Sequence, residues 1–329
     1  MSRLLEEPTV QPARRTEFSA FYEKTRDEPV YVILGVQGSG TNLLGRLLTR
    51  LFNFSVMRDR SSVFKAAARL GNAPDAEAVE REIRRFTNLV SPSAVRRKTS
   101  KDVIRKNVLF RGVEAELEPS RIRSGADFAR LIYAYRAFSL GATHVAIKSD
   151  DLWESIQAID TVLPNRRVIL LTRDFRDNLV SVSGKQFGPI EPVCAAAYVK
   201  GQVAHYAAEY RRAGRAGYHV KYETVLNDTR RFVEGFAGHF AIAPSVNLDV
   251  AIPALQFRPN KIGKWKALPP RQLAWCEGIL QEELREFGYP FASIRPERPG
   301  RRQLLVAAAK DKVKRVPQKV RRVLKRIRS

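Results

Sequence analysis

Short apolar runs alternate along the chain with longer stretches whose apolar residues have helical spacing. The short runs, rich in β-branched residues, predict strands near residues 31–36, 144–149, 167–173 and 218–223. After the first run, leucines three and four positions apart predict a helix. These are Leu43, Leu44, Leu47, Leu48 and Leu51. Strands that alternate with helices indicate an α/β fold, a three-layer α/β/α arrangement with a central parallel sheet.

The turn between the first predicted strand and helix is rich in glycine, with glycines at positions 35, 38 and 40. A helix start presents unpaired N–H groups and the positive end of the helix dipole, so this turn is suited to phosphate. Gly35 and Gly40 match the Walker A spacing, but Thr41 replaces its lysine and Asn42 its Ser/Thr. The turn therefore predicts phosphate binding without ordinary ATP or GTP hydrolysis.

A second candidate phosphate site follows the third predicted strand. Arg173 stands at the end of that strand, and Ser181 lies eight residues later on a predicted helix. A guanidinium and a hydroxyl placed this way can grip one phosphate together. The alternative is that Arg173 forms a structural ion pair with Asp174 or Asp177.

Together these segments resemble the PAPS-dependent sulfotransferase family, a P-loop fold, in its bacterial type. The family binds 3′-phosphoadenosine 5′-phosphosulfate (PAPS) with two motifs. Its 5′-phosphosulfate loop corresponds here to Gln37-Gly38-Ser39-Gly40-Thr41-Asn42. Its 3′-phosphate motif corresponds to Arg173-Asp174-Phe175-Arg176-Asp177 and ends at Ser181, with Phe175 in place of the usual proline.

Three further segments fit the same family in the same order. Residues 144–151 resemble a strand that ends in Lys-[TS]-His, with Lys148 at the lysine and Asp150 at the histidine. Residues 220–223 resemble a strand end of the Tyr-Glu-Asp type, and residues 258–266 a degenerate C-terminal Arg-Lys-Gly-x-x-Gly-Asp-Trp element. The resemblance therefore spans residues 31–290.

The resemblance implies an enzyme that moves a sulfuryl group from PAPS to an acceptor hydroxyl and needs no metal ion. It implies that the backbone N–H groups of residues 38–42 and the Thr41 hydroxyl hold the 5′-phosphosulfate, with Gln37 also in the cofactor-binding loop, and that Arg173, Ser181 and Arg258 hold the 3′-phosphate. Tyr222 would lie near the nucleotide, although a tyrosine at a strand end is also an ordinary core residue. The sequence does not decide whether Trp265 lies near the cofactor or packs in the core.

Two departures concern the reacting centre. Most family members have Lys or Arg at the position of Gly38, to neutralise charge on the bridging oxygen. Lys148 is the first candidate to replace that cation and Lys264 or Lys266 the second, while Lys148 could also be a surface lysine. By resemblance Asp150 is the candidate base, because burial beside a second carboxylate would raise its pKa. The alternative is that it caps the N-terminus of a following helix.

The charge of the chain is uneven. Its 329 residues include 58 Lys and Arg against 34 Asp and Glu, a net charge of +24. Residues 295–329 hold 14 basic and 2 acidic side chains, so half of the excess lies there. The remainder suits a doubly phosphorylated nucleotide and an anionic acceptor. Two distant cysteines and the lack of a signal-like or membrane-spanning segment predict a cytoplasmic protein.

We divide the chain into a polar lead-in (1–28), a sulfotransferase-like catalytic domain (29–294) and a basic tail (295–329). Residues 58–142 are predicted to be a helical insertion that builds the acceptor pocket or a lid. In the tail, apolar residues from Val313 to Ile327 recur at spacings of three and four among basic ones. This predicts a basic amphipathic helix, interrupted or started at Pro317, that binds a membrane surface. A solvated tail and nonspecific nucleic-acid contact are the alternatives.

The acceptor suggested by this tail is a saccharide or glycolipid at the inner membrane face. Two rival functions stay open. The first is a P-loop kinase or nucleotide hydrolase, which Thr41 at the lysine position disfavours. The second is a non-catalytic member of the fold that binds nucleotide or polyanion, which Gly38 and the missing histidine favour.

Overall fold

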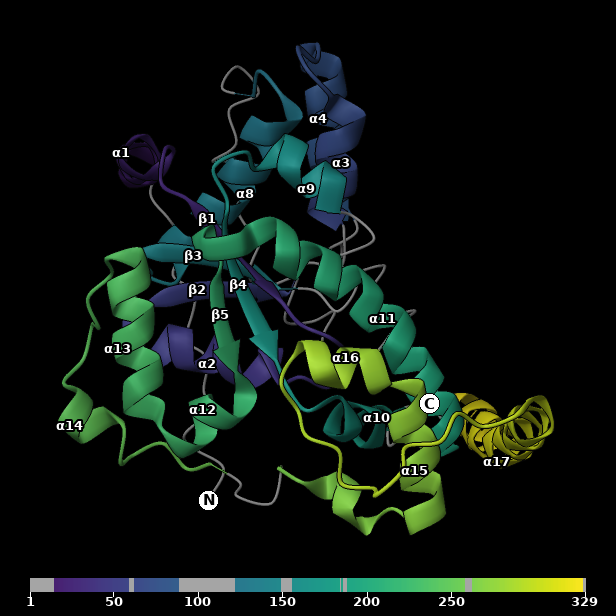
Figure 1. Cartoon of the computed structure of the whole chain (residues 1–329). Coiled ribbons are helices and arrows are strands. Elements are labelled where there is room, and N and C mark those ends of the chain that lie inside the picture. The colour runs from purple at the N-terminus through teal and green to yellow at the C-terminus, as the bar shows by residue number, and fades with distance from the viewer. Residues whose placement is uncertain are drawn as a thin grey trace. The chain divides into compact units, whose positions relative to one another are not determined.

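The computed structural model describes residues 15–58, 62–88, 122–148, 156–183, 185, 188–257 and 262–327 (Figure 1). The chain forms two compact units. Unit 1 comprises Met1–Ile33, Gly45–Val168 and Ala243–Val246. Unit 2 comprises Leu34–Leu44, Ile169–Ile242 and Asn247–Ser329. The glycine-rich loop and the segment after Arg173 therefore belong to the same unit.

The described strands form a five-stranded sheet in the order β2-β3-β1-β4-β5. They are β1 (Val30–Leu34), β2 (Phe54–Arg58), β3 (His144–Lys148), β4 (Arg167–Thr172) and β5 (Tyr218–Lys221). The pairs β1–β3, β2–β3 and β4–β5 are parallel. Every residue of β1 is buried, as expected for a parallel strand covered by helices on both faces. The predicted α/β fold with a central parallel sheet is confirmed.

Four of these strands coincide with the predicted apolar runs, whereas β2 has no counterpart in the sequence analysis. In unit 1, β2 pairs with β3 so that Val56 lies opposite Ala146. The described helices of this unit are α1 (Arg15–Thr25), α3 (Ser62–Leu70), α4 (Ala76–Asn88), α8 (Gly125–Ser139) and α9 (Ile156–Val162). The described parts of the predicted insertion are thus mostly helical, and residues 89–121 lie outside the described residues.

Helix α2 (Thr41–Phe52) follows the glycine-rich loop, as its leucine spacing predicts. The leucines that recur at three and four positions are buried, and they form the core-facing side of the helix. These are Leu44, Leu47, Leu48 and Leu51.

Unit 2 contains the remaining described helices. These are α10 (Phe175–Ser183), α11 (Pro192–Ala213), η4 (Gly214–Ala216), α12 (Tyr222–Asn227), α13 (Thr229–Phe240), α14 (Leu248–Ala251), η6 (Lys264–Ala267), α15 (Pro270–Ile279), α16 (Gln281–Glu286) and α17 (Arg301–Ile327). Aromatic rings pack between α10, α11 and the chain after α16: the Phe175 ring meets the Phe287 ring edge-on, and the Phe287 ring also packs on Tyr206.

Helix α17 confirms the predicted helical tail but differs from the prediction at Pro317. The helix begins at Arg301 and continues across Pro317 without interruption. Among the helices of the described residues, none is long and apolar enough to cross a membrane.

Candidate functional site

The glycine-rich loop connects β1 to α2 and has two glycines in backbone conformations that other residues rarely adopt. Gly38 has a φ angle of +88° and Gly40 one of +100°. The N–H groups of Leu43 and Leu44 donate to the carbonyl of Gly40, so the helix starts directly after this glycine. A Cβ atom on Gly40 would lie 2.4 Å from Cε2 of Tyr222, which leaves room for glycine alone. The loop thus presents its backbone and a helix start, the arrangement that favours phosphate.

Gln37 fixes the loop to helix α11. Its backbone N–H donates to Oε1 of Gln202 at 3.0 Å, and its side-chain Oε1 accepts from the Tyr198 hydroxyl at 2.8 Å. Its carbonyl accepts from Nδ2 of Asn178 at 3.1 Å. No pattern in the sequence predicts a role for any of these three partners. Their separation from Gln37 exceeds 140 positions in each case, so no local pattern could have found them.

Arg173 follows β4 and reaches back to the loop. Its Nη1 donates to the carbonyl of Gly38 at 2.7 Å, and its Nη2 lies 3.4 Å from Oδ2 of Asp177. The guanidinium carbon lies 4.5 Å from the ring centre of Tyr222. The ion pair with Asp177 weighed in the sequence analysis is therefore present, while Asp174 pairs with Arg176 instead. Arg173 is 4% exposed.

Ser181 also lies at the loop, on α10, where the sequence places it. A Cβ atom on Gly38 would lie 3.0 Å from Cβ and 3.2 Å from Oγ of Ser181. The loop and the two residues proposed for the 3′-phosphate therefore meet in unit 2. The contact also gives a physical reason for glycine at position 38, since a side chain there would require Ser181 to move.

Two polar atoms at the loop test whether it suits a polar ligand. The hydroxyl of Ser39 is buried, and it meets no hydrogen-bond partner in the part of the chain that the structure describes. The same holds for Oδ1 of Asn178. Buried polar atoms are normally satisfied. The Ser39 hydroxyl can donate a hydrogen bond, whereas Oδ1 of Asn178 can only accept one. A loop with two positive-φ glycines, a helix start and an unsatisfied hydroxyl fits an oxyanion group, and Arg173 supplies positive charge beside it.

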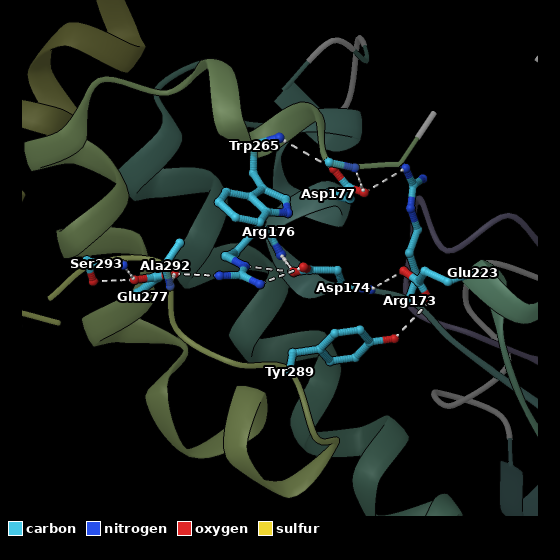
Figure 2. Close-up of polar contacts among 11 residues, drawn as sticks. Arg173, Asp174, Arg176, Asp177, Glu223, Trp265, Glu277, Tyr289, Ala292 and Ser293 are labelled. Carbon is cyan, nitrogen blue, oxygen red and sulfur yellow. Dashed lines mark hydrogen bonds and ion pairs between the residues drawn. The ribbon is translucent and has the colours of Figure 1, made fainter. Parts of the chain in front are cut away.

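Asp177 joins Arg173 to the turn that precedes η6 (Figure 2). This carboxylate is fully buried and accepts from the N–H of Gly263 at 2.8 Å and of Trp265 at 3.4 Å. The Trp265 ring in turn lies 3.9 Å from the guanidinium carbon of Arg176. Trp265 is half-buried, and the turn from 263 to 266 is thereby tied to α10.

Arg176 is the centre of a buried ionic network (Figure 2). It donates to both carboxylate oxygens of Asp174, at 2.9 and 2.7 Å, and to Oε1 of Glu277 at 2.5 Å. Burial disfavours the charge on this guanidinium, but the two carboxylates outweigh it and raise the pKa of Arg176. Burial also acts to raise the pKa of Glu277, yet the N–H groups of Ala292 and Ser293, the Ser293 hydroxyl and Arg176 hold that pKa below its ordinary value.

Tyr222 begins α12 and is buried, and its ring contacts both Gly40 and Arg173. Burial raises the pKa of Tyr222 above its ordinary value, so its hydroxyl stays protonated at neutral pH. The next residue, Glu223, accepts from the N–H of Asp174 and from the hydroxyl of Tyr289, both at 3.1 Å. These contacts tie the end of β5 to the segment after β4.

The other predicted site residues lie in unit 1, outside the described residues, or at the start of α2. Lys148 is the last residue of β3 in unit 1, where it is half-buried. Asp150 and Arg258 lie outside the described residues. Thr41 is buried at the first position of α2, and Asn42 beside it is exposed.

Comparisons with known proteins agree with this architecture. In structure the chain is similar to the sulfotransferase domain of the olefin synthase from Synechococcus PCC 7002, with 16% identity, a TM-score of 0.50 and coverage of 80% of this chain and 95% of that one. It is similar to the sulfotransferase domain of the curacin biosynthetic pathway, with 11% identity, a TM-score of 0.51 and coverage of 80% and 98%. These likenesses support the fold.

A third similar structure is the sulfotransferase STF9 from Mycobacterium avium, with 13% identity, a TM-score of 0.46 and coverage of 84% of this chain and 82% of that one. No curated protein matches the sequence. The model of the Sulfotransferase family matches residues 29–243, which is more than half of the chain and includes the loop, Arg173, Ser181 and Tyr222. The chain therefore belongs to the sulfotransferase family.

Proposed function

We propose that this protein transfers a sulfuryl group from PAPS to a hydroxyl group of an acceptor. The observation that carries the proposal is the meeting of three segments, distant in sequence, at the glycine-rich loop. Arg173 donates to the Gly38 carbonyl, Ser181 packs against the Gly38 backbone, and Tyr222 packs against Gly40. A cation, a hydroxyl and an aromatic ring beside a phosphate-type loop are the groups that a 3′,5′-bisphosphate nucleotide requires.

In this proposal each residue holds a defined part of the donor. Backbone N–H groups of residues 38–42 and the Thr41 hydroxyl bind the 5′-phosphosulfate, with Gln37 fixing the loop. Arg173 and Ser181 bind the 3′-phosphate together with Arg258, and Tyr222 lies near the nucleotide. The donor supplies an activated sulfuryl group and no metal ion takes part.

The transfer breaks the sulfur–oxygen bond to the donor phosphate and forms one to the acceptor oxygen. The acceptor hydroxyl must lose its proton, and we assign this task to Asp150. Charge that develops on the donor phosphate needs a cation. Gly38 cannot supply it, so we assign it to Lys148, with Lys264 and Lys266 as the second choice.

The acceptor in this proposal is a saccharide or glycolipid at the inner face of a membrane. The net charge of +24 supports an anionic acceptor or an anionic surface. The proposal accordingly places the protein in the cytoplasm, at the inner face of the membrane.

Calorimetric titration with 3′-phosphoadenosine 5′-phosphate and with AMP tests the donor assignment. Wild type should bind the bisphosphate in the micromolar range and AMP more weakly. Loss of a hydrogen bond to a charged group costs about 1.5–3 kcal/mol, so Arg173→Ala should weaken bisphosphate binding roughly ten- to a hundredfold and AMP binding little. Arg211→Ala, on the surface of the same unit, is the matched control.

The pattern of loss separates the proposed function from its rivals. If Arg173→Ala weakened both nucleotides equally, Arg173 would act only through its structural pair with Asp177. Bisphosphate binding without transfer of labelled sulfate from PAPS to any hydroxylated acceptor would favour the non-catalytic binding protein. Magnesium-dependent ATP turnover that survives Arg173→Ala would favour the kinase.

A further inference from the structure

Helix α17 exposes aliphatic side chains on the side that faces away from the rest of unit 2. Leu305 is 67% exposed, Val306 46% and Val313 71%. Ala307 and Asp311, one turn apart, are buried. At 100° per residue, Leu305, Val306 and Val313 lie on the side of the helix opposite to Ala307 and Asp311. A helix that packs only on its own protein has the reverse arrangement, with apolar residues inward.

A polar contact fixes which side of α17 faces the protein. Oδ1 of Asp311 accepts from the backbone N–H groups of Ile190 and Glu191, at 2.5 and 3.0 Å, directly before α11. Nζ of Lys314 lies 2.9 Å from Oε2 of Glu191. Figure 1 shows α17, in yellow, at the end of α11. Because these bonds hold the Asp311 side inward, the aliphatic side must face outward.

The charges of α17 indicate what the outward side contacts. The helix contains eleven basic residues and one acidic residue, and the acidic residue is the inward-facing Asp311. Cations therefore flank the exposed aliphatic residues without acidic neighbours on the helix. In the sequence the same apolar spacing continues from Val316 to Ile327. Aliphatic residues flanked by Lys and Arg are the pattern of a helix that lies in the interface of an anionic bilayer.

We propose that the outward side of α17, marked by Leu305, Val306 and Val313, docks on the surface of an anionic lipid bilayer. Charge complementarity favours this occupant over a second copy of the chain, because two such helices would bring their cations together. The composition of α17 also favours lipid over single-stranded nucleic acid. Proteins bind single strands by stacking bases on aromatic side chains, and the α17 sequence contains no aromatic residue. The proposal deepens the proposed function by naming the surface that brings the site to its acceptor, but it does not depend on the transfer chemistry.

Sedimentation of the full-length protein with vesicles tests this surface. Wild type should bind vesicles that mix phosphatidylcholine with phosphatidylglycerol and should stay in solution with phosphatidylcholine alone. Binding should weaken as salt is raised, because surface charges are screened. The double substitution Leu305→Ser with Val313→Ser removes apolar area and leaves the charge unchanged, so a loss of affinity of roughly tenfold or more measures insertion of this face.

Val250→Ser is the matched control, because Val250 is an aliphatic residue in α14 of the same unit and is 69% exposed. It should leave vesicle binding unchanged. Unaltered binding in the Leu305 and Val313 double variant would overturn the proposal, as would equal binding to both kinds of vesicle. A wild-type dimer that the double variant turns into a monomer, with no vesicle binding, would assign the face to a second copy and also overturn it.

The nucleotide titration keeps this proposal separate from the proposed function. Loss of vesicle binding with unchanged bisphosphate binding supports the docking face whatever the transfer assay gives. Failure of wild type to bind bisphosphate, with intact vesicle binding, would refute the donor assignment and leave the docking face standing.

Discussion

Replacing Arg176 by methionine should destabilise unit 2 strongly, because this residue neutralises two buried carboxylates. The side chain of Arg176 is 2% exposed, and it forms ion pairs with both Asp174 and Glu277. Methionine has no charge and replaces the aliphatic part of the arginine side chain. The substitution keeps the packing of that part while it removes the three hydrogen bonds that Arg176 donates through its guanidinium.

The expected loss in the free energy of unfolding depends on which hydrogen bonds each carboxylate retains in the variant. Breaking a buried ion pair by removing one partner costs about 3–5 kcal/mol. Glu277 keeps the N–H groups of Ala292 and Ser293, and Asp174 keeps the backbone N–H of residue 176. We therefore expect the lower end, about 3 kcal/mol. For a unit of this size, 1 kcal/mol corresponds to roughly 2–4 °C, so the melting temperature should fall by roughly 6–12 °C.

Thermal unfolding followed by circular dichroism measures this loss, and Arg230→Met is the control. Arg230 pairs with Asp249 in the same unit, but both side chains are well exposed, at 49% and 79%. Surface pairs of this kind contribute about 0–1 kcal/mol, so the control should shift the melting temperature little. If Arg176→Met shifted it no more than Arg230→Met, the buried network would not stabilise the fold and the reasoning would be refuted.

Three further predictions concern the loop, the pH dependence and the thiols. Gly40→Ala should lower stability by roughly 1–3 kcal/mol and impair nucleotide binding, because Gly40 has a φ of +100° and the new Cβ would meet the Tyr222 ring; a variant with wild-type melting and binding would contradict this packing. The depressed pKa of Glu277 means that the unfolded chain binds its proton more readily, so stability should fall as the pH drops through and below the ordinary value of 4.5. Urea titrations at several pH values measure how steeply the free energy of unfolding falls with pH, and Glu277→Gln should make this fall less steep. An equally steep fall in the variant would show that the Glu277 carboxylate does not contribute to the pH dependence. Burial raises the pKa of Cys276 to about 12, so a thiol reagent should label the half-buried Cys194 in the native protein and Cys276 only after unfolding; rapid native labelling of both would contradict the burial of Cys276.

The sequence by itself determined the elements whose signals are local. The leucines from Leu44 to Leu51 predicted both α2 and its buried face, because a helix repeats every 3.6 residues whatever surrounds it. The glycines of the loop and the Arg173 and Ser181 pair predicted phosphate-binding segments, and the family match covers both. The helical tail was also readable from its spacing, although its start at Arg301 and its continuation across Pro317 were not.

Tertiary structure alone decided the pairings between distant segments. Strand β2 gave no signal of its own because its five residues are stabilised by pairing with β3, some ninety positions later. The sequence did not decide between Asp174 and Asp177 as the partner of Arg173. In the folded chain Asp174 forms an ion pair with Arg176, and Arg173 contacts Asp177 and the Gly38 carbonyl. Likewise the spacing in α17 defined an apolar side, but only the bonds of Asp311 to the start of α11 turned that side outward. In each case burial and hydrogen bonding between residues far apart in the chain set the outcome, and a local pattern contains no information on such partners.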